Sequence, residues 1–203
     1  WRSDSTISRF NAMPAGWHVA DPETHLVTTR ALALARDSDG AFDPTVGPLV
    51  AQWGFGPISG SPRPDWRGLA LDAGTIGKAR DGLTLDLCGI AKGRALDRAV
   101  DMVRDAGLNN LLFDLGGEFK ALGQHPSGRD WHVAVQHPLA DQAPPAVLRL
   151  MPDTAVATSG LRRQSYVLAD HTYGHIINPR AAAPADAGLL SVSVVASDAM
   201  TAD

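Results

Sequence analysis

The chain of 203 residues is long enough for one domain with a full hydrophobic core, or for two small lobes. Its 44% apolar and 20% charged residues are an ordinary globular composition. The net charge of -4 argues against a broad nucleic-acid surface, and the single cysteine excludes both an intrachain disulfide and a cysteine-rich zinc site.

The first clear helical signal lies near the start of the chain. Asp21 is a good N-cap and Pro22 suits the first helical position, so we expect a helix that ends near Asp37, with Gly40 closing it. Two prolines and two glycines in residues 40–50 predict a loop. The segment GPISGSPRP predicts a second, surface-exposed loop.

The middle of the chain predicts a strand followed by a helix. Residues 83–87 are apolar and strand-like, and Cys88 is expected to be a small apolar filler after them. The helix runs from Ala91 towards Gly107, which is a good C-cap. Its apolar stripe consists of Ala91, Ala95, Leu96, Ala99, Val100 and Val103.

Short strands dominate the remainder of the sequence. The strand candidates are residues 111–117, 131–135, 147–151 and 191–196. Few helical segments separate them, which favours antiparallel pairing. We therefore predict an α+β fold, a single domain of mostly antiparallel sheet with flanking helices, over residues 1–203.

The two ends of the chain allow predictions about membrane segments and about a short terminal helix. No apolar run approaches the length of a membrane span, and no secretory signal is visible. The last seven residues, 197–203, allow a helix of less than two turns, capped by Ser197, which has little chance of packing on its own. We expect this helix to be frayed and the natural chain to continue at both ends, with any export signal or lipid anchor upstream.

The turn at residues 88–93 is the first candidate site. A strand that ends in glycine and opens a helix leaves unpaired N–H groups that attract anions, phosphates above all. The positive charge of Lys92 is unfavourable at the N-terminal end of the helix dipole unless an anion lies in front of it. Gly89 allows a ligand to approach the backbone. The alternative is a plain strand–helix connection with an exposed lysine, since neither the P-loop nor the dinucleotide motif is matched.

Four other segments strengthen the ligand interpretation. Asp43 lies in a rigid loop, Asp114 at a strand end, Ser159 beside a glycine turn with two arginines, and His175 beside a proline turn. Each alone is compatible with an ordinary turn or capped strand. Together they suggest a phosphate-bearing ligand with acids available for a metal ion.

Seven segments occur in the order typical of the FAD:protein FMN transferase family, the ApbE family, which the chain resembles over nearly its whole length. They are SDSTISRFN, GAFDPTVGPLVAQWGFG, LDLCGIAKGRALDRA, LLFDLGGEFKALG, AVATSG, HIINPR and VSVVASDAMTAD. The resemblance implies an α+β fold, FAD as substrate and Mg²⁺ as cofactor. It also implies transfer of FMN to a Thr or Ser hydroxyl of a target protein, with release of AMP.

The resemblance assigns roles to individual residues. Lys92 would meet FAD, His175 would take part in catalysis, and the metal would be held by the backbone carbonyl of Gly89 and by Asp203. The other residues matched to FAD contacts are Trp1, Ala41, Phe42, Asp43, Asp86 and Ile177. Two departures stand out, because the family usually has glycine where Cys88 stands, and a threonine expected four residues after Asp203 is not in this chain.

Two alternatives to the transferase stay open at this point. One is an FAD pyrophosphatase that yields FMN and AMP, and the other is a non-catalytic FAD-binding protein. The expected partners are FAD and a target protein, without nucleic acid, and with membrane contact only through an upstream anchor. The family is mostly extracytoplasmic in bacteria, so we expect a periplasmic or otherwise extracytoplasmic protein, with the cytoplasm as alternative.

Overall fold

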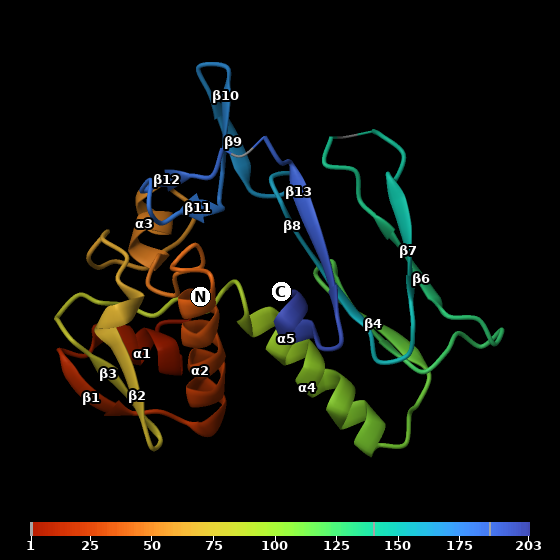
Figure 1. The fold of residues 1–203 in the computed structure, drawn as a ribbon, viewed down its shortest axis with the longest axis horizontal. Coiled ribbons are helices and arrows are strands. Elements are labelled where there is room, and N and C mark those ends of the chain that lie inside the picture. Colours follow the sequence, from red (N-terminus) through yellow and green to blue (C-terminus); the bar gives the residue numbers. More distant parts are fainter. Residues whose placement is uncertain (1, 140, 187) are drawn as a thin grey trace. The chain divides into compact units, whose positions relative to one another are not determined.

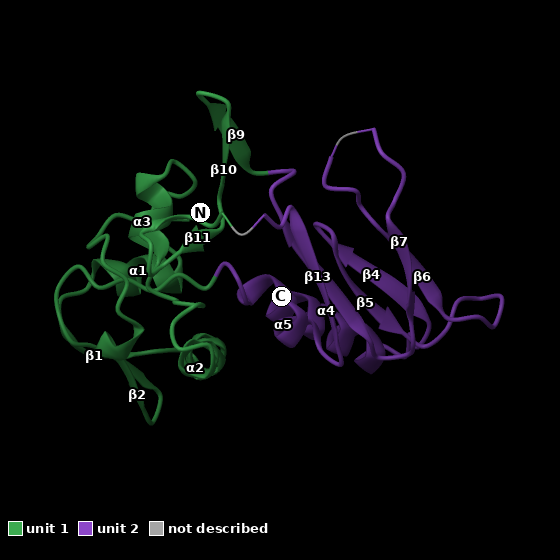
Figure 2. Ribbon diagram, turned by 45° about the horizontal axis from the view of Figure 1, so that its top comes forward, with its two compact units in different colours: residues 1–87, 164–187 green, residues 88–163, 188–203 purple. Residues whose placement is uncertain are grey.

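The computed structural model describes residues 2–139, 141–186 and 188–203, which form helices and antiparallel sheets (Figure 1). The chain divides into two compact units (Figure 2). Unit 1 comprises residues 1–87 and 164–187, and unit 2 comprises residues 88–163 and 188–203. Every strand pair in the described residues is antiparallel, which confirms the predicted α+β class.

Unit 1 opens with two capped helices, α1 (Thr6–Ala12) and α2 (Pro22–Asp37). α2 begins as predicted, because the side chain of Asp21 accepts a hydrogen bond from the N–H of Thr24 at 2.9 Å. This bond satisfies one of the N–H groups that the first turn of a helix leaves without a partner. The prediction for this helix is confirmed at both ends.

The loop predicted for residues 40–50 is only partly correct. Its second half folds into a short helix, α3 (Gly47–Gln52), with Pro48 near its start. Proline is tolerated in the first turn of a helix, where its missing N–H costs no hydrogen bond. The following segment, residues 56–64, is a loop as expected.

A small sheet with the strand order β1-β3-β2 completes the first part of unit 1. Its members are β1 (Gly16–Val19), β2 (Leu69–Asp72), which a 3₁₀ turn precedes, and β3 (Thr75–Lys78). After residue 163 the chain returns to unit 1 with two hairpins: β9 (Ser165–Leu168) with β10 (His171–Gly174), and β11 (Ile177–Asn178) with β12 (Ala183–Pro184).

The segment 83–87 is buried, but the prediction that it forms a strand is wrong. Its backbone is satisfied by other means than a strand partner. The N–H of Leu85 donates to Oδ1 of Asn11 at 2.7 Å, and Nδ2 of Asn11 donates to the carbonyl of Leu85 at 2.9 Å. The N–H of Asp86 donates to the carbonyl of Pro44 at 2.7 Å. This segment can be buried without a neighbouring strand because these partners replace the backbone hydrogen bonds that a β-sheet would provide.

Unit 2 is built on a sheet with the strand order β13-β8-β5-β4. Its strands are β4 (Leu111–Leu115), β5 (Glu118–Leu122), β8 (Ala155–Gly160) and β13 (Ser191–Ala196). A separate hairpin consists of β6 (Trp131–Val135) and β7 (Ala146–Leu150), and the helices are α4 (Ala91–Asp105) and α5 (Ala199–Ala202).

Two apolar clusters place the layers of unit 2. Leu96 of α4 and the alanines of α5 pack against Ala155 and Ala157 on one face of the sheet. The neighbouring Val156 points to the other face, where it packs with Val133 of β6. Since successive residues of a strand face opposite sides, β8 contributes to both clusters. The sheet is therefore covered by α4 and α5 on one side and by the β6–β7 hairpin on the other.

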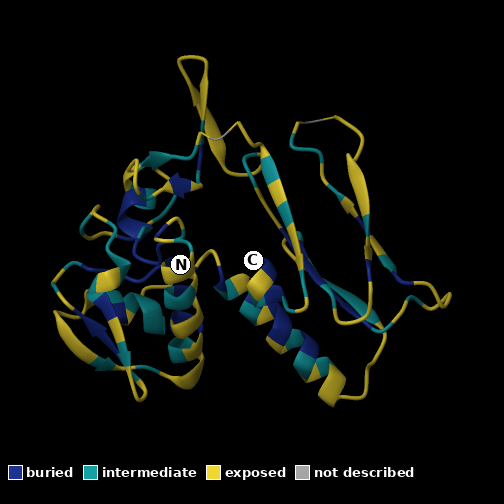
Figure 3. Cartoon of the chain, in the orientation of Figure 1, coloured by how far each residue is buried: buried dark blue, intermediate teal, exposed yellow. Residues whose placement is uncertain are grey.

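The predicted apolar stripe of α4 is correct at its centre and wrong at its edges. Leu96 and Val100 are buried, but Ala95 is exposed and the charged Asp97 is buried. Figure 3 shows buried, intermediate and exposed residues interspersed along this helix. Cys88, expected to be buried before this helix, is also exposed.

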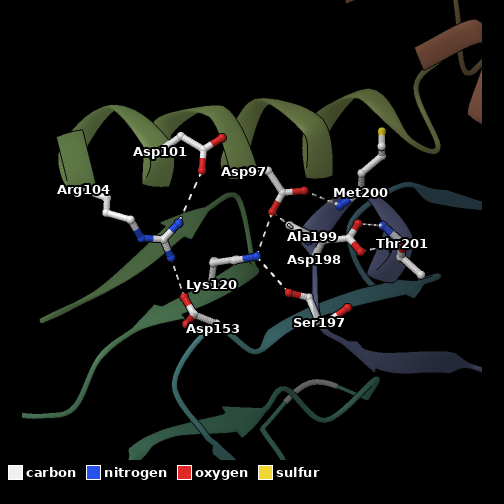
Figure 4. A network of polar contacts seen from close by, with 10 residues as sticks. All are labelled: Asp97, Asp101, Arg104, Lys120, Asp153, Ser197, Asp198, Ala199, Met200 and Thr201. Carbon is white, nitrogen blue, oxygen red and sulfur yellow. Dashed lines mark hydrogen bonds and ion pairs between the residues drawn. The ribbon is translucent and has the colours of Figure 1, made fainter. Parts of the chain in front are cut away.

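The terminal helix α5 is packed, which contradicts the expectation that it is frayed. Ala199 and Ala202 are 2% and 4% exposed. The helix is capped by Asp198 and not by Ser197, because Oδ1 of Asp198 accepts the N–H of Thr201 at 2.8 Å (Figure 4). A helix of four residues is not stable alone, so its order comes from these contacts.

Gly93 allows α4 and α5 to approach each other. A Cβ atom at this position would lie 2.7 Å from Cα of Met200, and closer still to the carbonyl oxygen of Ala199. Because both are backbone atoms of α5, they cannot move without displacing the helix. Glycine is therefore required at position 93, because any side chain there would clash with the backbone of α5.

The substitution Gly93→Ala is expected to destabilise the protein by about 1–3 kcal/mol, the usual cost of overpacking a well-packed site. Helix propensity alone predicts the opposite sign, since alanine is favoured over glycine by about 1 kcal/mol in a helix. Urea unfolding of the variant and the parent protein measures the difference. A variant more stable than the parent would contradict the close approach.

Candidate functional site

The predicted site residues fall into two groups, one in each unit. Gly89, Lys92, Ser159 and Asp203 belong to unit 2. The residues in unit 1 are Ala41, Phe42, Asp43, Asp86, His175 and Ile177. Trp1 lies outside the described residues.

Three charged side chains of unit 2, Lys92, Glu118 and Asp203, form what we term the Lys92 cluster. Nζ of Lys92 donates a hydrogen bond to Oε1 of Glu118 and lies 4.0 Å from Oδ1 of Asp203. The side chain of Lys92 is 53% exposed, whereas those of Glu118 and Asp203 are 4% and 6% exposed. The cluster therefore presents a cation to the surface above two buried acids.

Asp203 lies at the start of α4, where the sequence predicts an anion. Ile90, the N-cap residue, makes no capping bond with its side chain. Instead, Oδ2 of Asp203 accepts the N–H of Gly93 at 3.0 Å, so this carboxylate caps α4 from 110 residues further along the chain. A negative charge is favourable at the positive end of the helix dipole. The anion attracted to this turn in the structure is thus a side chain of the protein.

Glu118 is the member of the cluster that the sequence reasoning missed. Burial raises its pKa to about 7; the hydrogen bond from Lys92 lowers it, and Asp203 raises it. Its Oε2 atom is buried without a hydrogen-bond partner in the described structure. An unpartnered buried oxygen is costly, and its occurrence beside two other charged groups favours a ligand-binding function. The only signal in the sequence was an acid directly after the two glycines that end the predicted strand 111–117.

The raised pKa of Glu118 predicts a pH dependence of stability. A carboxyl group with a higher pKa in the folded than in the unfolded state stabilises the fold below its unfolded pKa, and this contribution is lost as the pH rises through about 7. Replacing Glu118 with glutamine removes the titration. Between pH 5 and pH 8 the parent protein is therefore expected to lose up to about 3 kcal/mol relative to Glu118→Gln. Parallel stability profiles in urea unfolding would contradict this assignment.

The Lys92 cluster fits the chemistry of a magnesium ion in part. Carboxylate oxygens of Asp203 and the unpartnered oxygen of Glu118 are hard donors, which Mg²⁺ prefers, and Gly89 lies in an exposed turn. No group of three or more His, Cys, Asp and Glu side chains suited to a metal occurs within the described part of the chain. The donors present would therefore need completion, as Mg²⁺ commonly takes ligands from substrate phosphates.

Ser159, also in unit 2, lies on β8 opposite Val192 of β13. Its side chain is exposed. The adjacent Thr158 is hydrogen-bonded through its hydroxyl to that of Ser193 at 2.7 Å. The structure thus places both hydroxyl residues on β8, directly before Gly160, which ends the strand.

Asp43 organises a loop in unit 1. Its Oδ1 accepts hydrogen bonds from the N–H and the hydroxyl of Thr45, at 2.8 and 2.6 Å, and its Oδ2 accepts the N–H of Trp66 at 3.3 Å. The carboxylate is 7% exposed. Both oxygens thus hold the loop in shape, while Ala41 is exposed and Phe42 is half-buried beside it.

Two other candidate residues of unit 1, the acidic Asp86 and the apolar Ile177, are buried. Asp86 lies against the start of α3, because a Cβ at Gly47 would be 3.1 Å from its Oδ2. Ile177 is 9% exposed and pairs with Pro184 in the β11–β12 hairpin. Neither position could be placed in space from the sequence.

His175 lies at the end of a row of aromatic rings that the sequence reasoning did not identify. The rings of Phe55, Tyr166, Tyr173 and Trp53 stack in succession, with centroids 5.3, 5.5 and 5.6 Å apart. The ring of His175 meets Phe55 edge-on at 6.3 Å. The two tyrosines lie directly opposite each other in the β9–β10 hairpin, three residues before and three residues after the turn at 169–170, and this symmetry was the signal for the hairpin.

The hydrogen bond of His175 favours one tautomer of its neutral ring. Nδ1 lies 3.2 Å from the backbone carbonyl of Gln164, which can only accept. Nδ1 therefore carries the hydrogen in the neutral ring, and Nε2 keeps the lone pair that can take a proton. This arrangement has the form expected of a general base.

Among the helices of the described residues, none combines the length and apolar character needed to span a membrane.

Comparisons with known proteins agree with the arrangement of these elements. The FAD:protein FMN transferase of Vibrio cholerae serotype O1 is 33% identical over 220 residues, which cover 100% of this chain and 65% of that protein. The enzyme of the same name from Escherichia coli K12 is 31% identical, with 100% and 63% covered. The chain thus spans slightly less than two thirds of the length of these curated relatives.

Solved structures show the same fold. The flavin transferase ApbE from Vibrio cholerae superposes with a TM-score of 0.87 at 32% identity, covering 100% of this chain and 69% of that one. The ApbE protein of Thermotoga maritima gives a TM-score of 0.89 at 31% identity, with the same coverage. The sequence profile of the ApbE family matches residues 1–203. The chain belongs to the ApbE family.

Proposed function

We propose that the protein transfers FMN from FAD to a Thr or Ser hydroxyl of a target protein and releases AMP. The observation that carries this proposal is the Lys92 cluster, a partly exposed cation held by two buried acids at the start of a helix. The membership in the ApbE family and the names of the transferases that the chain resembles support the same reaction.

The pyrophosphate of FAD explains why such a cluster is useful. Its closely spaced negative charges repel a hydroxyl nucleophile, and Lys92 would neutralise part of this charge as it develops during transfer. Mg²⁺, held by the carbonyl of Gly89 and by Asp203, would supply further positive charge to the phosphate oxygens. The remaining contacts to FAD are proposed for Ala41, Phe42, Asp43, Asp86, Ser159 and Ile177.

The transfer step requires a base. The oxygen of the acceptor hydroxyl forms a bond to the phosphorus on the FMN side of the pyrophosphate, and AMP leaves with the bridging oxygen. The proton of the hydroxyl passes to Nε2 of His175, which has the lone pair because Nδ1 faces a carbonyl. If water attacked in place of the hydroxyl, the same chemistry would yield FMN and AMP.

The test is an incubation of the full-length protein with FAD, Mg²⁺ and a candidate acceptor protein. Covalent flavin on the acceptor, seen as in-gel fluorescence, together with AMP in equal amount, is the expected result. AMP with free FMN and no labelled acceptor would identify a pyrophosphatase. Binding of FAD without AMP release would identify a flavin-binding protein, and either result would overturn the proposal.

We further propose that the protein works outside the cytoplasm, as expected from the resemblance. Recovery of the protein in the cytosolic fraction of cells of its native host would contradict this location.

A further inference from the structure

α4 and α5 cap each other in both directions. Oδ1 and Oδ2 of Asp97, on α4, accept the N–H groups of Ala199 and Met200 at 2.9 and 3.0 Å (Figure 4). These are the first two residues of α5. In return, Oδ2 of Asp203, directly after α5, accepts the N–H of Gly93 in the first turn of α4. Each helix thus satisfies N–H groups that the other leaves without an internal partner.

Lys120 completes this arrangement from the sheet. Its Nζ donates to Oδ1 of Asp97 and to the carbonyl of Ser197, both at 3.0 Å. The side chains of Lys120 and Asp97 are 9% and 12% exposed. One buried ion pair therefore holds both the start of α5 and the chain that leads into it.

We propose that Asp97 and Lys120 are positioning residues, which fix α5 so that Asp203 keeps its carboxylate at the start of α4 beside Lys92. Asp203 directly follows α5, a helix of four residues, so any shift or rotation of α5 moves Asp203 with it. The inference that this positioning matters for catalysis rests on the proposed function.

The chemistry of the pair favours positioning over bulk stability. Replacing a buried ion pair by apolar residues of similar volume is often neutral or stabilising, so such a pair is a weak source of stability. It is directional, however: the two oxygens of Asp97 each face a different N–H group, and Nζ of Lys120 faces two different oxygens. Apolar packing of Ala199 and Ala202 alone leaves the rotation of α5 less defined.

Amide hydrogen exchange in the folded protein tests the inference without any assay of activity. The Gly93 amide reports whether the carboxylate of Asp203 is in place. The Ala121 amide, bonded to the carbonyl of Thr154 at 2.9 Å inside the sheet, reports opening of unit 2 as a whole. In Asp97→Asn, exchange at Gly93 is expected to accelerate by about 10-fold or more, with little change at Ala121.

The chain offers a matched control in Asp130→Asn. Asp130 is a buried aspartate paired with Arg149 at 2.6 Å, beside the β6–β7 hairpin on the other side of the sheet. This variant is expected to leave Gly93 protected relative to Ala121. Equal acceleration at Gly93 and Ala121 in Asp97→Asn, or unchanged exchange at Gly93, would overturn the proposal.

Two further variants of Lys120 sharpen the test. Lys120→Arg keeps the charge and is expected to retain most of the protection at Gly93. Lys120→Gln removes the cation but leaves the hydrogen bonds from the N–H groups of Ala199 and Met200 to Asp97, so it is the milder change. If Asp97→Asn yields no folded protein, Lys120→Gln provides the test. Gly93 as well protected in Lys120→Gln as in the parent would then count against positioning.

A second readout connects the pair to the proposed reaction. The Mg²⁺ concentration for half-maximal FMN transfer by the full-length protein is expected to rise by about 10-fold in Asp97→Asn and to stay unchanged in Asp130→Asn. A parent protein that transfers no FMN would refute the proposed function, whereas the exchange experiment would still decide whether the pair positions Asp203.

Discussion

Replacing His175 with alanine is expected to lower the rate of FMN transfer by roughly 10²–10⁴-fold, the usual contribution of a positioned general base. The affinity for FAD is expected to change little, because the proposed role of the ring is to take a proton from the acceptor. The bond from Nδ1 to the carbonyl of Gln164 directs the basic lone pair to Nε2. Single-turnover transfer and FAD titration measure the two effects separately.

His171 provides the control for this experiment. It lies on β10, which ends one residue before His175, is exposed, and contacts the ring of Tyr173 edge-on at 4.6 Å. His171→Ala removes an imidazole four residues before His175 without touching the bond to Gln164. Normal turnover of His175→Ala, or equal losses in both variants, would remove His175 from the proton transfer.

The substitution Lys92→Ala is expected to weaken FAD binding by about 10- to 100-fold and to slow turnover as well, because it removes the charge-assisted hydrogen bond that we propose Lys92 makes to the pyrophosphate. The change also leaves Glu118 buried without its cationic partner. The pKa of Glu118 should therefore rise above the parent value, since the hydrogen bond from Lys92 lowers it. Calorimetric titration with FAD, with turnover measured in parallel, determines the outcome.

Lys92→Arg is the matched variant, since it keeps the positive charge on a longer side chain. It is expected to bind FAD more tightly than Lys92→Ala. Unchanged FAD affinity in Lys92→Ala would show that the lysine serves only to neutralise Glu118 and Asp203.

Local signals in the sequence were sufficient for several elements. Asp21 and Pro22 mark the start of α2 because capping depends on neighbours within one turn. The strands 131–135 and 191–196 were predicted with the bounds that the structure shows. Such elements depend on residues close in the chain, which the sequence displays directly.

Elements that depend on distant partners were missed. The apolar residues 83–87 indicated burial correctly, but the partner of Leu85 is the side chain of Asn11, 74 residues away. β5 was not predicted because Glu118 and Lys120 interrupt its apolar pattern. Both are buried, and each is compensated by a charge on α4.

The candidate site shows the same limit. The anion-binding character of the turn before α4 followed from its glycine and from the unfavourable place of Lys92. That Asp203 would provide the anion, and Glu118 the partner of the lysine, could not follow from pattern alone, because both contacts join segments far apart in sequence. The resemblance to the ApbE family identified Asp203 as important through a different role, as a metal ligand.

The reciprocal capping of α4 and α5 has a consequence for the order of folding. α4 and the β6–β7 hairpin are local in sequence and can form early, whereas Asp203 reaches Gly93 only after a loop of more than one hundred residues has closed. The start of α4 is therefore expected to acquire its cap later than the local turns of the helix form. During synthesis, the turn that carries Lys92 leaves the ribosome 110 residues before the acid that caps it, so Lys92 and the turn reach their final arrangement only after Asp203 has been made.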